Sequence, residues 1–126
     1  MNYSAKKIYL NCDEHIVRDW ADFMRHHQDE IVRSLTQENV RHEMWFMGRD
    51  DALYVIGVMD VDDLAASSKI AVQSALEVDK VHRAFKAHWN RDHIETLTID
   101  PSRAPNFANS ELLFEARTEP SQARKE

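Results

Sequence analysis

The sequence predicts a single α+β domain built around an antiparallel β-sheet of four strands. Apolar residues recur at helical spacing over residues 13–39, whereas residues 40–61 hold two β-rich runs separated by the turn-forming stretch "GRDD". A second helical pattern covers residues 62–90, and a last β-rich run lies at residues 111–117. With a short strand at residues 7–11, the element order is β-α-β-β-α-β.

The first strand and the first helix follow directly from the apolar pattern. "KIYLN", residues 7–11, alternates in the way a half-buried strand does. We then expect one long helix over residues 13–39, with Asp13 as its N-cap and Asn39 as a left-handed stop. The apolar stripe of this helix consists of Ile16, Val17, Trp20, Phe23, Met24, Ile31, Val32 and Leu35.

Residues 40–61 are predicted to form a β-hairpin whose turn is the four residues "GRDD". Side chains alternate between the two faces of a strand, so the turn length decides which residues share a face. This turn places Trp45 opposite Tyr54, and Glu43 opposite Ile56. All four then lie on one face of the sheet.

The second half is predicted to contain a split helix. A short helix is expected over residues 62–72, and a capping box formed by Ser74 and Glu77 starts a second helix that ends near Asn90. "IETLTI", which follows, reads either as a short extra strand or as the end of that helix. The whole order is that of the ferredoxin-like split βαβ arrangement, with both helices on one face of the sheet. The domain is expected to span residues 1–117, followed by a flexible tail at residues 118–126.

Composition and charge exclude several classes of protein. Hydrophobic residues make up 43% and charged residues 30% of the chain, which is a globular composition. The formal net charge of −6 argues against nucleic acid as a partner. The chain contains neither a signal peptide nor an apolar run of the ~20 residues that span a bilayer, so a soluble cytoplasmic protein is expected. The single cysteine, Cys12, excludes an internal disulfide, and no cofactor is expected.

The apolar face of the hairpin predicts an assembly. A face that carries Trp45, Tyr54 and Ile56 is too apolar to remain in water, and the simplest cover is the same face of a second copy. We therefore expect a homodimer with a shared cavity, lined by Glu43 and Arg41 and by the aromatic residues Trp45, Tyr54 and Tyr9. A small-molecule ligand in that cavity, with Glu43 as an acid–base group of raised pKa, is the first functional hypothesis. The alternative for Glu43 is an ion pair with Arg41 or with the partner chain.

His82 is the second candidate for acid–base chemistry. It lies at the centre of the apolar stripe that also holds Val78, Phe85 and Trp89. Asp79 precedes it by three residues, which is close enough on a helix to accept an imidazole N–H and to raise the basicity of the ring. The alternative is a core histidine whose hydrogen bonds are satisfied for structural reasons.

Two further functions stay open. His27, His42 and His82 lie on elements that pack together, so a metal or haem site is conceivable, although no H-E-x-x-H spacing is present and no metal ligand is assigned. The third possibility is a packed dimer interface without a cavity.

The motifs "EMWF" and "VDKVH", together with a tryptophan on the first helix and a "DPSRAP" turn, resemble a bacterial family of unknown function placed among the dimeric α+β barrels. The resemblance covers residues 5–117 and implies a dimeric ferredoxin-like barrel, but no activity. More distantly, the element order is similar to that of L-rhamnose mutarotase and of the small barrel monooxygenases. Mutarotases carry a tyrosine four residues before the histidine of the first helix, where this chain has Asn11 before His15.

Overall fold

The computed structural model describes residues 2–100 and 105–118, and its centre is one antiparallel sheet. The strands are β1 (Tyr3–Leu10), β2 (Val40–Arg49), β3 (Leu53–Val61), β4 (Trp89–Leu97) and β5 (Ser110–Arg117), in the spatial order β4-β1-β3-β2-β5. The helices are α1 (Glu14–Arg25), α2 (Gln28–Glu38), α3 (Leu64–Gln73), α4 (Glu77–Phe85) and a 3₁₀ turn, η1 (Lys86–His88).

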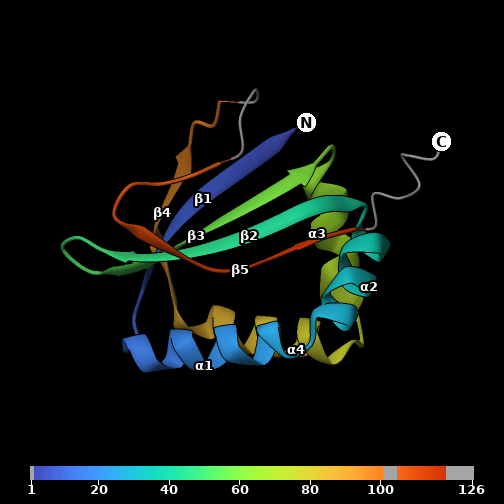
Figure 1. Cartoon of the computed structure of the whole chain (residues 1–126), viewed down its shortest axis with the longest axis horizontal. Coiled ribbons are helices and arrows are strands. Elements are labelled where there is room, and N and C mark those ends of the chain that lie inside the picture. The colour runs from blue at the N-terminus through green and yellow to red at the C-terminus, as the bar shows by residue number, and fades with distance from the viewer. Residues whose placement is uncertain (1, 101–104, 119–126) are drawn as a thin grey trace.

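The helices form a layer against one face of the sheet, with α1 beside α4 and α2 beside α3 (Figure 1). The predicted α+β class is therefore confirmed, whereas the predicted four strands are wrong, because the sheet has five. The stretch that reads as an extra strand or a helix end belongs to β4, which pairs with β1 at one edge. The predicted last strand is β5, which pairs with β2 at the opposite edge.

The predicted long helix is two helices, with a break at His27. The backbone of His27 leaves the helical region (φ −128°, ψ 38°), and its imidazole Nδ1 donates a hydrogen bond to the carbonyl of Phe23 over 2.6 Å. Because a break changes direction without losing the apolar stripe, α2 turns away from α1 toward α3 (Figure 1). Both predicted ends are confirmed: Asp13 is the N-cap, and Asn39 is left-handed (φ 59°).

The predicted capping box of Ser74 and Glu77 is wrong. Helix α4 begins at Glu77 with Leu76 as its N-cap, and the Ser74 hydroxyl accepts a hydrogen bond from the Leu76 N–H. The free N–H of Val78 donates instead to Glu30 on α2, over 2.9 Å. A carboxylate from a neighbouring helix therefore caps α4, which sequence spacing within α4 cannot reveal. Helix α4 also ends earlier than predicted, so the expected end near Asn90 lies within β4.

The register of the β2–β3 hairpin differs from the predicted register by an odd number of residues. Arg49 pairs with Leu53 and Trp45 pairs with Gly57, so the loop is shorter than the predicted four-residue turn. An odd shift moves every side chain of one strand to the other face of the sheet. Tyr54 therefore does not share a face with Trp45. Trp45 and Glu43 point toward the helices.

The face away from the helices is covered by the chain itself. Its buried residues are Ala5, Tyr9, Met44, Phe46, Tyr54, Ile56 and Val58. Leu97, at the end of β4, packs on them together with Ile99 and Phe107 from the connection between β4 and β5. The rings of Phe46 and Phe107 meet edge to face at 5.1 Å. The apolar surface that predicted a second copy is thus already buried within one chain, which corrects the physical argument for a shared cavity there. Homodimerisation itself stays a prediction.

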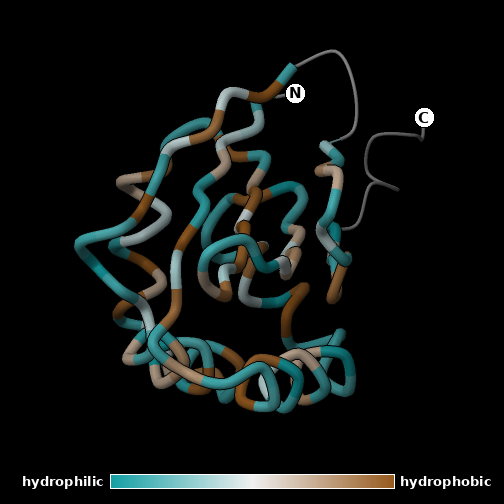
Figure 2. The backbone as a smooth tube through the Cα atoms, turned by 90° about the vertical axis from the view of Figure 1, so that its left-hand side faces the viewer, coloured by the Kyte–Doolittle hydropathy of each residue, from teal (hydrophilic) through white to brown (hydrophobic). Residues whose placement is uncertain are grey.

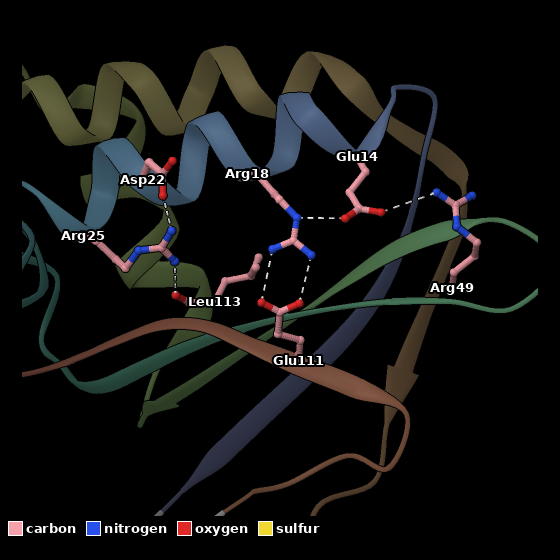
Figure 3. A network of polar contacts seen from close by, with 7 residues as sticks. All are labelled: Glu14, Arg18, Asp22, Arg25, Arg49, Glu111 and Leu113. Carbon is pink, nitrogen blue, oxygen red and sulfur yellow. Dashed lines mark hydrogen bonds and ion pairs between the residues drawn. The ribbon is translucent and has the colours of Figure 1, made fainter.

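Hydrophobic and hydrophilic segments alternate along both the strands and the helix layer, as the side view shows (Figure 2). One ion-pair network fastens α1 to the edge of the sheet, where the Arg18 guanidinium donates two hydrogen bonds to Glu111 of β5, at 3.0 and 3.1 Å, and one to Glu14 (Figure 3). Arg25 donates to the carbonyl of Leu113 on the same strand. Since these side chains are about half exposed, solvent screens the ion pairs, and they orient α1 more than they stabilise it.

Of the predicted tail, only its first residue, Thr118, is among the described residues. The Thr118 N–H donates to the carbonyl of Arg41 over 3.0 Å, which extends the pairing at the end of β5. The rest of the predicted tail, residues 119–126, and most of the "DPSRAP" turn lie outside the described residues. No helix within the described part of the chain is long and apolar enough to cross a membrane.

We predict that replacing Phe107 by alanine lowers the free energy of unfolding by about 2 kcal/mol, because it uncovers Phe46 and leaves a gap over the sheet. Chemical denaturation measures this change. The matched control is Val72→Ala on α3, where the side chain is 62% exposed and the expected loss stays within about 0.5 kcal/mol. Equal losses in the two variants would show that the connection does not cover this face.

Candidate functional site

Gly57 of β3 allows the indole of Trp45 to lie against the backbone of the neighbouring strand. A Cβ atom added to Gly57 would lie 2.6 Å from the Trp45 ring, well inside van der Waals contact. Trp45 is buried, although one side of it faces a cavity. The glycine is therefore required by close approach rather than by backbone conformation.

His82 of α4 is surrounded by all three tryptophans of the chain. Its ring stacks on Trp20 at 5.6 Å and meets Trp45 edge to face at 5.3 Å, and Trp89 lies at 6.1 Å. Trp20 also stacks on Phe85, at 4.1 Å, which fixes its plane. The predicted stripe of α4 therefore exists, although Trp89 joins it from β4 rather than from the helix.

This aromatic environment keeps His82 neutral. Burial, together with the nearby positive charges of Lys86 and Arg83, lowers the pKa of His82 to about 3. Within the described residues its buried Nδ1 has no hydrogen-bond partner, and the same is true of the indole Nε1 of Trp20 and of Trp89. Buried polar atoms are usually paired, so three unpaired ring nitrogens close together are unusual.

A cavity of about 250 Å³ lies between the sheet and helices α3 and α4, and we call it the sheet–helix cavity. Its residues on the strands are Ser4, Lys6, Ile8, Trp45, Gly57, Met59, Trp89, Arg91 and Ile94, and those on the helices are Leu64, Ser68, His82 and Lys86. A volume of this size suits a small molecule of roughly ten to fifteen heavy atoms.

A smaller hollow of about 70 Å³ adjoins this cavity, and we call it the acidic recess. Three carboxyl groups line it: Glu38 of α2, Glu43 of β2 and Asp79 of α4. His82 and Lys86 line both spaces, so the two spaces lie next to each other at these residues. Ionising all three carboxyls in a buried space that holds only one lysine is unfavourable in free energy.

The Ser34 hydroxyl links two of these carboxyls. It lies 2.8 Å from Glu38 Oε2 and 2.7 Å from Asp79 Oδ1. A hydroxyl has a single hydrogen, so the two carboxyls compete for one donor. Burial raises the pKa of Glu38 to about 7, the hydrogen bond from Ser34 partly offsets this, and the charge of Asp79 adds to the rise.

Glu43 is the carboxyl best suited to exchange a proton near neutral pH. Burial raises its pKa to about 7, the indole N–H of Trp45 partly offsets this, and the charges of Glu38 and Asp79 raise it further. Lys86 faces the same carboxyls from η1, and burial together with Arg91 lowers its own pKa. A group that changes charge near neutral pH beside a cavity is typical of functional sites.

The three residues that the sequence nominates for acid–base chemistry do meet: Glu43, Asp79 and His82 all line the acidic recess. They meet on the helix side of the sheet rather than on the predicted outer face. The predicted hydrogen bond from His82 to Asp79 is absent, because Asp79 bonds to Ser34 and its second oxygen, Oδ2, has no partner among the described residues. Asp79 therefore does not raise the basicity of His82.

Of the predicted ligand-binding residues, only Trp45 lines the sheet–helix cavity. Arg41 bonds to Asp60 and Asp62 rather than to Glu43. Tyr54 and Tyr9 lie on the opposite face of the sheet, where Tyr54 meets Ser110 at 3.1 Å and Tyr9 donates to Asp50 at 2.7 Å. The odd register shift accounts for the displacement of Tyr54.

The histidines considered for metal binding lie apart. His42 sits between the Tyr3 hydroxyl (2.8 Å) and Glu115 (2.7 Å) on the outer face, and His27 bonds to its own helix. The described part of the chain contains no group of three or more His, Cys, Asp or Glu side chains arranged to hold a metal ion.

Sequence reasoning missed Glu38, Lys86, Arg91 and Gly57 as site residues. Glu38 could have been found from the sequence, because the helical spacing i, i+3, i+4 and i+7 places it on the apolar face of α2. The residues with this spacing are Ile31, Ser34, Leu35 and Glu38. Lys86 follows His82 by one helical turn in the same way. Arg91 and Gly57 left none, since both depend on strand pairing.

A model of the family of unknown function (DUF6176) matches residues 8–109. This range includes every carboxyl of the acidic recess and most of the sheet–helix cavity. No curated protein and no solved structure matches the chain. The comparisons therefore supply a family but no activity.

We predict that Glu43→Gln changes the pH dependence of stability. In the unfolded chain Glu43 titrates near its ordinary pKa of 4.5, and in the folded protein near 7. Between these values only the folded state holds the proton, so stability falls as pH rises through this range and stays low above it. Glutamine cannot ionise, so the variant should be more stable than the parent at pH 8, by up to about 3 kcal/mol, and nearly equal to it at pH 4.5.

Urea denaturation at a series of pH values measures both effects. Glu38 titrates in the same range, so we expect the variant to retain about half of the pH dependence. The control is Asp19→Asn, an exposed position on α1 with the same change in charge. A pH profile of Glu43→Gln that parallels the parent would mean that Glu43 is ionised normally.

Proposed function

The chain belongs to this family of unknown function, and we propose that it binds a small molecule in the sheet–helix cavity and exchanges a proton with it through Glu43. The observation that carries the proposal is the adjacency of two spaces: a largely apolar cavity of about 250 Å³ and a recess that holds a carboxyl with a pKa of about 7. Binding sites of this kind combine apolar walls with a few convergent polar groups.

Polar side chains line the cavity together with the apolar ones, and they include Ser68 and His82. Neutral His82 offers one donor and one acceptor, which suits recognition better than proton transfer at neutral pH.

Glu43 then serves as the acid–base group. Its carboxyl changes between charged and neutral forms near pH 7, so it can take a proton from a bound molecule and return it without a metal or an organic cofactor. Glu38 and Asp79 are held by Ser34. Their role is to raise the pKa of Glu43 by their proximity.

The two other functions considered have weaker support. A dimerisation module relies on an exposed apolar face, and that face is covered by Leu97, Ile99 and Phe107. A metal or haem site relies on His27, His42 and His82 approaching one another, and the structure separates them.

We predict that Gly57→Ala abolishes ligand binding, because the added methyl group pushes the Trp45 ring into the cavity. Binding is measured with a library of neutral and charged ring compounds, by the shifts of the three tryptophan indole N–H signals in the proton–nitrogen NMR spectrum. Compounds that bind should move the signal of Trp89. They should lose at least tenfold in affinity against Gly57→Ala.

The matched control is Gly48→Ala on the same hairpin. Its added methyl group would press on Tyr54, on the opposite face of the sheet, and should leave binding unchanged. Thermal melting of both variants confirms that they are folded. Equal affinity in parent and Gly57→Ala would exclude this cavity as the binding site.

The proton-exchange role has its own test in the pH dependence of ligand affinity. We expect the affinity to change with a midpoint near pH 7 in the parent, to keep a midpoint at lower pH in Glu38→Gln, and to lose the midpoint in Glu43→Gln. Calorimetric titration in buffers of different ionisation enthalpy counts the protons exchanged. A midpoint that survives in Glu43→Gln would assign the proton to another group.

A further inference from the structure

We infer that the ligand of the sheet–helix cavity is a small organic anion: a flat, largely apolar molecule that carries one carboxylate. This inference rests on the proposed binding function and adds the chemical class of the ligand. It is carried by the three cations that line the cavity and by its apolar and aromatic wall.

Three cations line the cavity: Lys6 of β1, Lys86 of η1 and Arg91 of β4. No carboxylate among the described residues forms an ion pair with any of them. Lys6 and Arg91 are exposed, whereas Lys86 is half-buried and lies within the influence of the Glu38 and Glu43 carboxyls. Together the three bring positive charge from three separate elements to one cavity.

Two of these cations converge on a single ring. Lys86 Nζ lies 5.3 Å and the Arg91 guanidinium 5.7 Å from the centroid of Trp89. Burial lowers the pKa of Lys86, and repulsion by Arg91 lowers it further, while Glu38 and Glu43 act in the opposite direction. An anion placed between the two groups would remove this repulsion and would also suit the fork of donors on Arg91.

The residues that line the sheet–helix cavity indicate the shape and polarity of the rest of the ligand. Ile8, Trp45 and Met59 give the sheet side of the cavity an apolar surface on which a flat ring can lie. One carboxylate beside the cations and a ring along the sheet match both features of the cavity.

The test uses 4-fluorobenzoate and its neutral counterpart 4-fluorobenzamide as probes, with fluorine NMR of the probe as the readout. We expect the parent protein to bind the carboxylate at least tenfold more tightly than the amide. Raising the salt concentration should weaken binding of the carboxylate only. Inorganic phosphate is added as a competitor, and it should not displace the carboxylate because it has no ring to contact the sheet.

Two variants, each with a matched control, locate the effect. Lys86→Met and Arg91→Gln should each weaken binding of 4-fluorobenzoate at least fivefold and leave 4-fluorobenzamide unchanged. The controls Lys80→Met and Arg33→Gln, at exposed positions on α4 and α2 that do not line the cavity, should bind both probes like the parent. Arg91 is exposed on an edge strand, so its variant tests the inference even if Lys86→Met folds poorly.

The outcomes separate this inference from the proposed function. If the amide binds as well as the carboxylate and Gly57→Ala abolishes both, the cavity binds small molecules but does not select anions, and the inference is wrong. Displacement by phosphate alone would also contradict it. If neither probe binds the parent at millimolar concentration while other compounds of the library do, the carboxylate class is rejected. If no compound binds, the proposed function fails with it.

Discussion

The close approach of Trp45 to the backbone of Gly57 is the contact on which the rest of the site depends. The chain contains only two glycines, both lie in the β2–β3 hairpin, and each lies beneath an aromatic ring of the neighbouring strand: Gly57 beneath Trp45 and Gly48 beneath Tyr54. A register shifted by one residue would place a side chain beneath each ring. The hairpin therefore has one pairing in which both rings fit, and this pairing turns Glu43 toward the helices.

With Glu43 on that side, the core of the molecule becomes unusual. Most of the space between sheet and helices is filled by Val17, Trp20, Leu35, Val55 and other apolar side chains. Two neighbouring spaces between the sheet and the helices are not filled in this way. They are lined instead by groups that include three carboxyls, a lysine and a neutral histidine. Carboxyls with a pKa near 7 destabilise the fold when they ionise in a buried position. Well-packed apolar residues of the same size would stabilise it more. An arrangement that lowers stability in this way is expected where a function requires it.

Assembly and ligand binding are separate questions in this molecule. The outer face of the sheet, which would otherwise need a partner, is covered by the segment between β4 and β5, whereas the sheet–helix cavity lies on the opposite side of the sheet. The charges at the cavity also differ in sign from those of the whole chain, so attraction of an anion there is local and short-range.

The sequence by itself determined the class of the fold, the positions of most strands, the ends at Asp13 and Asn39, and the identity of Glu43, Asp79 and His82 as the residues to watch. These features depend on local periodicity and on charges that interrupt an apolar stripe, and both can be read along one element. Tertiary structure alone decided the break at His27, the fifth strand, the cap that Glu30 gives to α4, and the face on which Glu43 lies. The last three of these depend on contacts between residues far apart in the chain, and a single odd step in strand register would move Glu43 to the other face.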